Sequence, residues 1–158
     1  MCIILELWIY SYLTYFVVNM CNPSRHPDMH IQAHTSGHIQ SQNYPSPSPD
    51  TTNEACTVKL LVNDLVSVLF TVDGNFSIPE SNGNCQHDAR IWIGGNEYAD
   101  DNTCLFCGTR SSGYKLHQIL ANSNTSQNGI TIGYRFNSWA DPKIKSFFRI
   151  MYTGQLSY

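Results

Sequence analysis

The chain has 158 residues and a formal net charge of −3; 42% of its residues are hydrophobic and only 13% are charged. This length suits one domain with a core of its own, and the charged share is about half of that in an average globular protein. The composition excludes a coiled coil and a charged disordered tail. The slightly negative charge gives no basis for a nucleic acid as partner.

An apolar run covers residues 7–18 near the N-terminus. The run is too short to span a bilayer at about 1.5 Å per residue, but it is typical of the hydrophobic region of a signal peptide. We therefore expect residues 1–20 to be a signal peptide, and the protein to be secreted with no membrane span. Two glycosylation sequons, at Asn75 and Asn124, agree with secretion. Residues 21–35 are polar and show no sustained period, which predicts an arm that contains histidines.

Farther along, apolar and polar residues alternate with a period of two. The segments are 57–62, 66–72, 130–136 and 148–152. Alternation over such short runs, with turn residues between them, is typical of half-buried antiparallel strands. No segment keeps a helical period over three turns; residues 114–120 come nearest and also fit a strand. The pattern predicts an all-β sandwich of antiparallel sheets.

Six cysteines are scattered along the chain. They are Cys2, Cys21, Cys56, Cys85, Cys104 and Cys107. A zinc site needs two close pairs and there is one, so the set favours disulfides and an oxidising compartment. Spacing alone does not choose among the pairings that six cysteines allow. A redox function for the CxxC pair is disfavoured because no βαβ pattern surrounds it.

Four histidines follow one another at four-residue steps. They are His26, His30, His34 and His38. On a helix this spacing would stack imidazoles for metal binding, but Pro27 and Gly37 argue against a helix through all four. Incidental histidines are the simpler interpretation. A secreted metal-handling protein that uses this arm is the alternative function.

Seven short motifs along residues 36–152 resemble, in order, those of the CUB domain family. Residues 36–45 match the pattern S-G-x-I-x-S-x-N-Y-P. The others are V-x-V-x-F at 66–70, C-x-x-D at 85–88, I-x-I at 91–93, C-G at 107–108, N-x-I-x-I to F-x-S at 128–138, and F-x-I-x-Y at 148–152. The resemblance implies a disulfide-bonded jelly-roll β-sandwich over residues 36–153, with 154–158 as a tail.

The resemblance also implies two disulfides, Cys85–Cys107 and Cys21–Cys56. The second pair spans a longer segment than is usual in the family. Cys104 has no family counterpart, and three possibilities stay open for it: a free thiol, a partner for Cys56, or the link of a disulfide-bonded dimer.

A calcium site is a further implication. Calcium-binding CUB domains have an acidic residue five positions before the third cysteine and an Asp three positions after it, which here are Glu80 and Asp88. Trp139 replaces the family's third carboxylate, so we expect Asp141 to serve in its place. Three carboxylates with backbone carbonyls and water supply the oxygen ligands that Ca²⁺ prefers; without Asp141 the ion would be held weakly.

The chain carries none of the common catalytic motifs, such as H-E-x-x-H, G-x-S-x-G or a Gly-rich phosphate loop, and we expect it not to be an enzyme. Because function on such scaffolds lies in the loops, the sequence predicts a recognition module. The expected ligand is an extracellular protein, or a glycan, bound by the loops at one end. In the family the partner often places a Lys or Arg beside the calcium ion, so the calcium loops would be the binding face.

Overall fold

The computed structural model describes residues 16–21, 29–50, 55–63, 66–85, 89–94, 103–120, 129–137 and 145–157. These residues form β-strands, turns and irregular segments, with no helix among them. Consequently, no helix within these ranges is long and apolar enough to cross a membrane.

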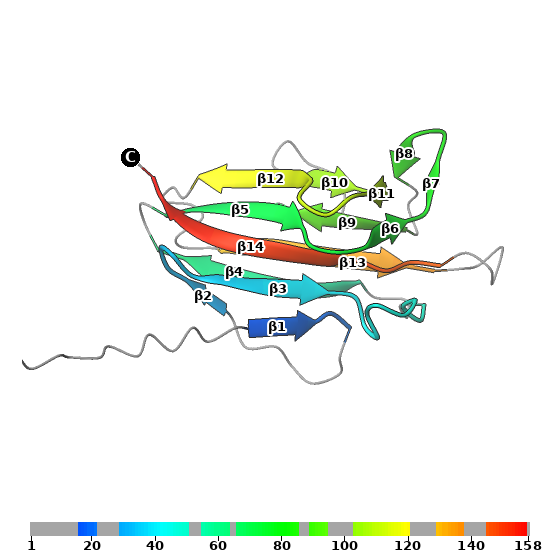
Figure 1. Ribbon diagram of the computed structural model, residues 1–158, viewed down its shortest axis with the longest axis horizontal. Helices are drawn as coiled ribbons and strands as arrows, with labels where there is room; N and C mark the ends of the chain where they lie inside the picture. The colour runs from blue at the N-terminus through cyan, green and yellow to red at the C-terminus, as the bar shows by residue number, and fades with distance from the viewer. Residues whose placement is uncertain are drawn as a thin grey trace, which may run out of the picture.

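Two five-stranded sheets form the body of the molecule (Figure 1). The first has, in spatial order, β1 (Phe16–Asn19), β3 (Ser36–Gln40), β14 (Arg149–Leu156), β5 (Val66–Val72) and β12 (Lys115–Leu120). The second has β10 (Cys104–Phe106), β9 (Ala89–Ile93), β13 (Ile130–Phe136), β4 (Cys56–Val62) and β2 (Met29–Ile31). Two small sheets pair β11 (Gly108–Arg110) with β6 (Phe76–Ile78), and β7 (Glu80–Ser81) with β8 (Asn84–Cys85). The all-β sandwich predicted from the alternation is confirmed.

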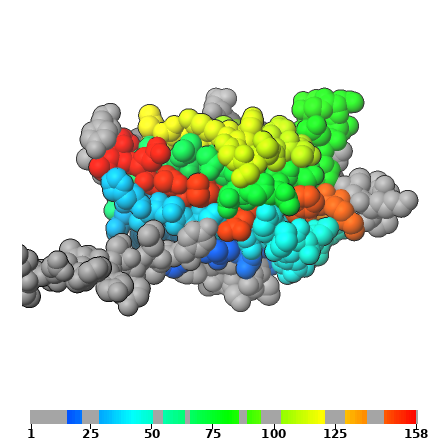
Figure 2. Space-filling view, viewed as in Figure 1, coloured from blue at the N-terminus to red at the C-terminus, as the bar shows by residue number. Residues whose placement is uncertain are grey.

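The core lies between the two large sheets. Its fully buried side chains, at 0% exposure, include Ile39, Leu60, Val68, Phe70, Ile91, Ile132, Tyr134 and Phe148. The rings of Tyr134 and Phe148 meet edge to face, with centroids 4.9 Å apart. Burial of each large apolar side chain contributes about 1.5–3 kcal/mol, which is why the period-two segments fold with these residues inward. The space-filling view shows the strands of the first sheet packed side by side over this core (Figure 2).

At two positions within strands, an aromatic ring on the neighbouring strand lies so close that only glycine fits. Trp92, 2% exposed, is the register partner of Gly133, and a Cβ at that glycine would overlap its indole. Tyr152 covers Gly37 in the same way. A glycine inside a strand often marks such a close approach. The glycine of the S-G-x-I motif therefore lies within β3, where the tyrosine needs the space.

The N-terminal boundaries differ from those expected. β1 lies inside the segment assigned to the signal peptide, and Val18 and Met20 are buried, at 8% and 0% exposure. β2 lies inside the expected polar arm, and its Ile31 is 2% exposed. Residues 29–31 are thus part of the folded domain. A strand of three residues is too short for a period of two to be recognised in the sequence.

Both of these strands pair in parallel, β1 with β3 and β2 with β4, although the sequence led us to expect antiparallel sheets. The first four strands alternate between the two sheets. If the chain also reverses direction at each connection, the first and third strands point the same way, and so do the second and fourth. Because β1 lies next to β3 and β2 next to β4, both pairs are parallel. At the other end of the chain, β14 continues to Leu156, so the sheet includes most of the expected tail.

Candidate functional site

The β7–β8 hairpin positions Glu80, the first of the three expected calcium ligands. Glu80 pairs with Cys85, and the turn between the strands is Asn82-Gly83. Both turn residues have positive φ, 52° and 76°, as a two-residue type I′ turn requires. An Asn-Gly pair is itself a hairpin signal, and the sequence analysis did not use it.

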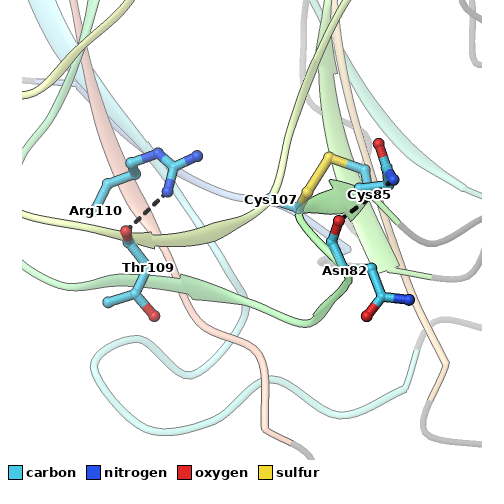
Figure 3. The surroundings of a disulfide bond; sticks show 6 residues. Asn82, Cys85, Cys107, Thr109 and Arg110 are labelled. Carbon is cyan, nitrogen blue, oxygen red and sulfur yellow. Dashed lines mark hydrogen bonds between the residues drawn. A yellow bond between two sulfur atoms is a disulfide. The ribbon is translucent and has the colours of Figure 1, made fainter.

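Two disulfides are present. Cys85–Cys107 joins this hairpin to the start of β11, with Cα atoms 5.3 Å apart (Figure 3). Cys21–Cys56 joins the segment after β1 to β4, with Cα atoms 5.1 Å apart. Both distances are ordinary for disulfides. These are the two pairs that the resemblance implies, and the first holds the Glu80 hairpin on the body of the sandwich.

Glu80 has a cation beside it. A Cβ placed on Gly108 would meet the Oε2 atom of Glu80 and would lie 3.0 Å from the Nη1 atom of Arg110, so both groups occupy the space over this glycine. Arg110 also donates a 3.0 Å hydrogen bond to the carbonyl oxygen of Thr109 (Figure 3). The Glu80 side chain is exposed. A metal ion at Glu80 would compete with this guanidinium.

The other two expected ligands, Asp88 and Asp141, lie outside the described residues. The strands next to them are informative, because Ala89 at the start of β9 pairs with Phe136 at the end of β13. The chain therefore enters β9 and leaves β13 at one place, at the same end of the sandwich as the β7–β8 hairpin (Figure 1). Within the described ranges no three metal-ligating side chains form a cluster. An exposed carboxylate at this end fits part of a calcium site.

The histidines do not form a continuous arm. His38 is 2% exposed, and its Nε2 lies 2.6 Å from Oδ2 of Asp73, which also lies 3.3 Å from Nε of Arg149. Burial and the nearby Arg149 lower the pKa of His38 despite the opposing effect of Asp73. His30 and His34 are exposed, and His26 lies outside the described residues. His38 therefore belongs to the interior, and the arm of the metal-handling alternative, residues 21–35, contains the other three histidines.

Cys104 is a free thiol next to a histidine that the sequence analysis did not single out. Its Sγ lies 3.5 Å from Nδ1 and 3.6 Å from Nε2 of His117. Cys104 is on β10 and His117 on β12, the outermost strands of the two sheets on that side. Burial and then Lys115 lower the pKa of His117. Because Cys56 is bonded to Cys21, it is not the partner of Cys104.

Asn75, the first sequon residue, is exposed just before β6. Its backbone N–H donates a 2.9 Å hydrogen bond to the hydroxyl of Tyr44. The second sequon, at Asn124, lies outside the described residues.

Comparisons with known proteins point to one kind of domain. No family model matches the chain. The chain is 28% identical over 79 residues to Cubilin of Canis lupus familiaris, an alignment that covers 49% of this chain and 2% of that protein. The chain thus spans a very small part of this relative.

Three solved structures share the fold. The MASP-1 CUB2 domain bound to Ca²⁺ has a TM-score of 0.54 at 19% identity, covering 82% of this chain and 99% of that one. The CUB1-EGF-CUB2 domains of rat MASP-1 give 0.54 at 19% identity, covering 81% and 41%. The full extracellular region of zebrafish Gpr126/Adgrg6 gives 0.55 at 15% identity, covering 82% and 15%. The chain therefore has the fold of a CUB domain, as its motifs indicate.

Proposed function

We propose that this chain is a secreted, extracellular recognition module that binds a protein partner through the loops at the β7–β8 end of the sandwich. The observation that carries the proposal is the CUB fold with a disulfide-anchored hairpin at that end. Two disulfides in a small domain suit an oxidising, extracellular compartment. Loops on a rigid sandwich are where binding residues concentrate, and binding rather than catalysis is the proposed activity.

We propose further that calcium assists this binding through Glu80, Asp88 and Asp141. Glu80 is exposed at the end of the sandwich where the chain enters β9 and leaves β13, and in the sequence Asp88 directly precedes β9 and Asp141 follows β13. A structural neighbour, the MASP-1 CUB2 domain, is bound to Ca²⁺. Without Asp141 the ion would be held only weakly, in the millimolar range typical of looser extracellular sites. A Lys or Arg of the partner would contact the same carboxylates.

Calorimetric titration of Ca²⁺ into the secreted protein tests the site. We expect saturable heat that is lost in Asp88→Ala and reduced in Glu80→Gln. Asp64→Asn is the matched control, since it removes one carboxylate that is not among the three proposed ligands. Absence of heat at millimolar calcium, or heat that survives Asp88→Ala, would show that the calcium proposal is wrong.

Capture of extracellular proteins on the immobilised chain, with identification by mass spectrometry, tests the recognition function. We expect a protein that is retained with calcium and released by a chelator, and that Asp88→Ala fails to retain. A partner retained equally with and without calcium would support recognition and contradict the role of calcium. Absence of any specific protein at both conditions would contradict the function itself.

Two covalent features complete the proposal. We propose that Asn75 carries an N-linked glycan and that Cys104, a partly exposed free thiol on an outermost strand, links two copies of the chain. A non-reducing gel of the secreted protein should show a dimer that disappears with Cys104→Ser. A glycosidase should lower the mass of the wild-type protein more than that of Asn75→Gln. A monomer on the first gel, or equal mass changes in the second experiment, would contradict the respective feature.

A further inference from the structure

A polar hollow lies at the ends of β1 and β3. Its volume is about 420 Å³, within the usual range of ligand sites. The residues that line it are Asn19, Gln40, Gln42, Asn43 and Tyr44. Four of the five carry carboxamides and the fifth a phenol, with no carboxylate or amine among them. The hollow lies at the β1 edge of the first sheet, and the β7–β8 hairpin lies at the same end of the sandwich but on the other side of that sheet's width, toward the β12 edge (Figure 1).

The walls of the hollow are attached to the core. The backbone N–H of Met20, a residue with 0% exposure, donates to the carbonyl oxygen of Gln40 at 2.8 Å. Buried Ser41 donates its N–H to the carbonyl oxygen of Phe148 at 3.0 Å, and its Oγ accepts from the Phe148 N–H at 3.1 Å. Asn19 and Gln40 are joined by a 2.7 Å bond from Nε2 to Oδ1. These hydrogen bonds hold Asn19 and Gln40 in place before any ligand arrives, which lowers the entropic cost of binding.

Asn43 and Tyr44 are held by the turn that follows β3. Asn43 has a φ of 66°, a conformation that asparagine tolerates better than most residues. The N–H of Tyr44 donates to the Ser41 carbonyl oxygen at 3.1 Å. The Tyr44 hydroxyl accepts the N–H of Asn75, and the Arg149 guanidinium lies 5.9 Å from the centre of its ring. The Tyr44 side chain is therefore held both at its hydroxyl group and at its ring.

The chemistry of this lining selects a class of ligand. A carboxamide offers two donors and an acceptor and carries no charge. Four carboxamides match a ligand that has many groups able both to donate and to accept hydrogen bonds. They carry no charge that would attract an ionic ligand. A tyrosine ring adds an apolar surface with a polar tip. Sugar rings combine these features, since they carry neighbouring hydroxyl groups and apolar C–H faces.

We infer that this hollow binds a neutral saccharide. The site goes beyond the protein-binding function proposed above and rests on none of its calcium ligands. It contains Asn19 of β1, so it exists in a mature chain that retains this strand.

Titration of the secreted chain with methyl mannoside, lactose and diacetylchitobiose, followed by NMR or calorimetry in the presence of a calcium chelator, tests the site. Asn75 lies next to Tyr44, so the same titration is run on Ser77→Ala, which removes this sequon and with it any glycan on Asn75. We expect at least one of these sugars to bind saturably at millimolar concentration. Gln42→Ala and Asn43→Gly should each weaken binding about tenfold, the effect of losing one good hydrogen bond.

The choice of variants keeps the fold intact. Glycine at position 43 retains the positive φ, and Gln42 is only partly buried. Gln118→Ala on β12 is the matched control, since it removes an exposed carboxamide from the far edge of the same sheet. Failure of all three sugars to bind, or binding that survives Gln42→Ala and Asn43→Gly, would overturn the inference. Calcium-dependent capture of a protein partner would be unaffected by that failure.

Discussion

The indole of Trp92 fills the space beside Gly133, its register partner on the next strand of the second sheet. Trp92 is 2% exposed, so the ring has no free space into which it can withdraw. Interiors are close-packed, and an extra methyl group at such a position forces side chains or backbone to shift.

Gly133→Ala should therefore lower the free energy of unfolding by about 1–3 kcal/mol, as overpacking does in other cores. Urea denaturation at equilibrium measures the loss. The double variant Gly133→Ala with Trp92→Val should lose less than the sum of the two single variants, because the smaller side chain frees the space. Additive losses would contradict the contact.

Acid should destabilise the protein before its carboxylates are protonated. Burial and Arg149 hold the pKa of His38 below its usual 6.5, so near neutral pH the folded state keeps the ring uncharged. Below pH about 6.5 the unfolded chain binds a proton at this residue that the folded chain resists, so stability falls as the pH falls. His117, whose pKa is also lowered, acts in the same direction.

Unfolding free energies between pH 7.5 and 5.5, a window of about two units around the ordinary histidine value, measure this dependence. The slope should be smaller in His38→Gln than in the wild type. Gln32→Ala at an exposed position removes no titratable group; it provides the control and should leave the slope unchanged. Equal slopes in the two variants would contradict a role for the buried ring.

The disulfide between Cys85 and Cys107 should matter far more for secretion than the free thiol. The bond closes a sequence separation of 22 residues, which in the chain-entropy model contributes about 3 kcal/mol. Cys85→Ser should therefore cut the amount of secreted protein sharply, while Cys104→Ser should leave it nearly unchanged. Quantitative blots of medium and cell lysate measure both. Equal losses would contradict the assigned pairing.

The packing of β1 bears on where a signal peptide is removed. Cleavage after residue 20 would take Val18 and Met20 out of the core and would remove a strand from the first sheet. We therefore expect the secreted chain to retain residues 16–20, although the sequence alone suggests cleavage after residue 20. Mass spectrometry of the secreted chain identifies the N-terminus directly. A mature chain that begins at Cys21 would show this expectation to be wrong.

The sequence predicted the elements that are long enough to show a period. β4, β5 and β13 cover the first three alternating segments, and β14 covers the fourth from Arg149 onward. Residues 115–120 form a strand in the region that allowed either structure. β2 was missed because three residues carry no period. β7 and β8 have two residues each, and only the Asn-Gly turn could have revealed them.

Contacts between residues far apart in the chain could not be predicted from the sequence. The pairing of Cys104 with His117 depends on the outermost strands of two sheets lying together, and the His38–Asp73 contact depends on how β3 is placed next to the turn after β5. Neither contact is indicated by a pattern in the neighbouring sequence. Glu80 was found through a family spacing, but the guanidinium of Arg110 beside it follows only from the pairing of β6 with β11.

The first two strands cover the backbone edges of two longer strands, β3 and β4. β1 and β2 are the outermost strands on one side, and without them β3 and β4 would each present a row of unpaired backbone N–H and C=O groups to solvent. Such rows are templates for strand addition between molecules. A protease that trimmed the chain back to residue 32 would leave most core residues in place, yet it would open the longer edges of β3 and β4 to pairing with strands of other molecules.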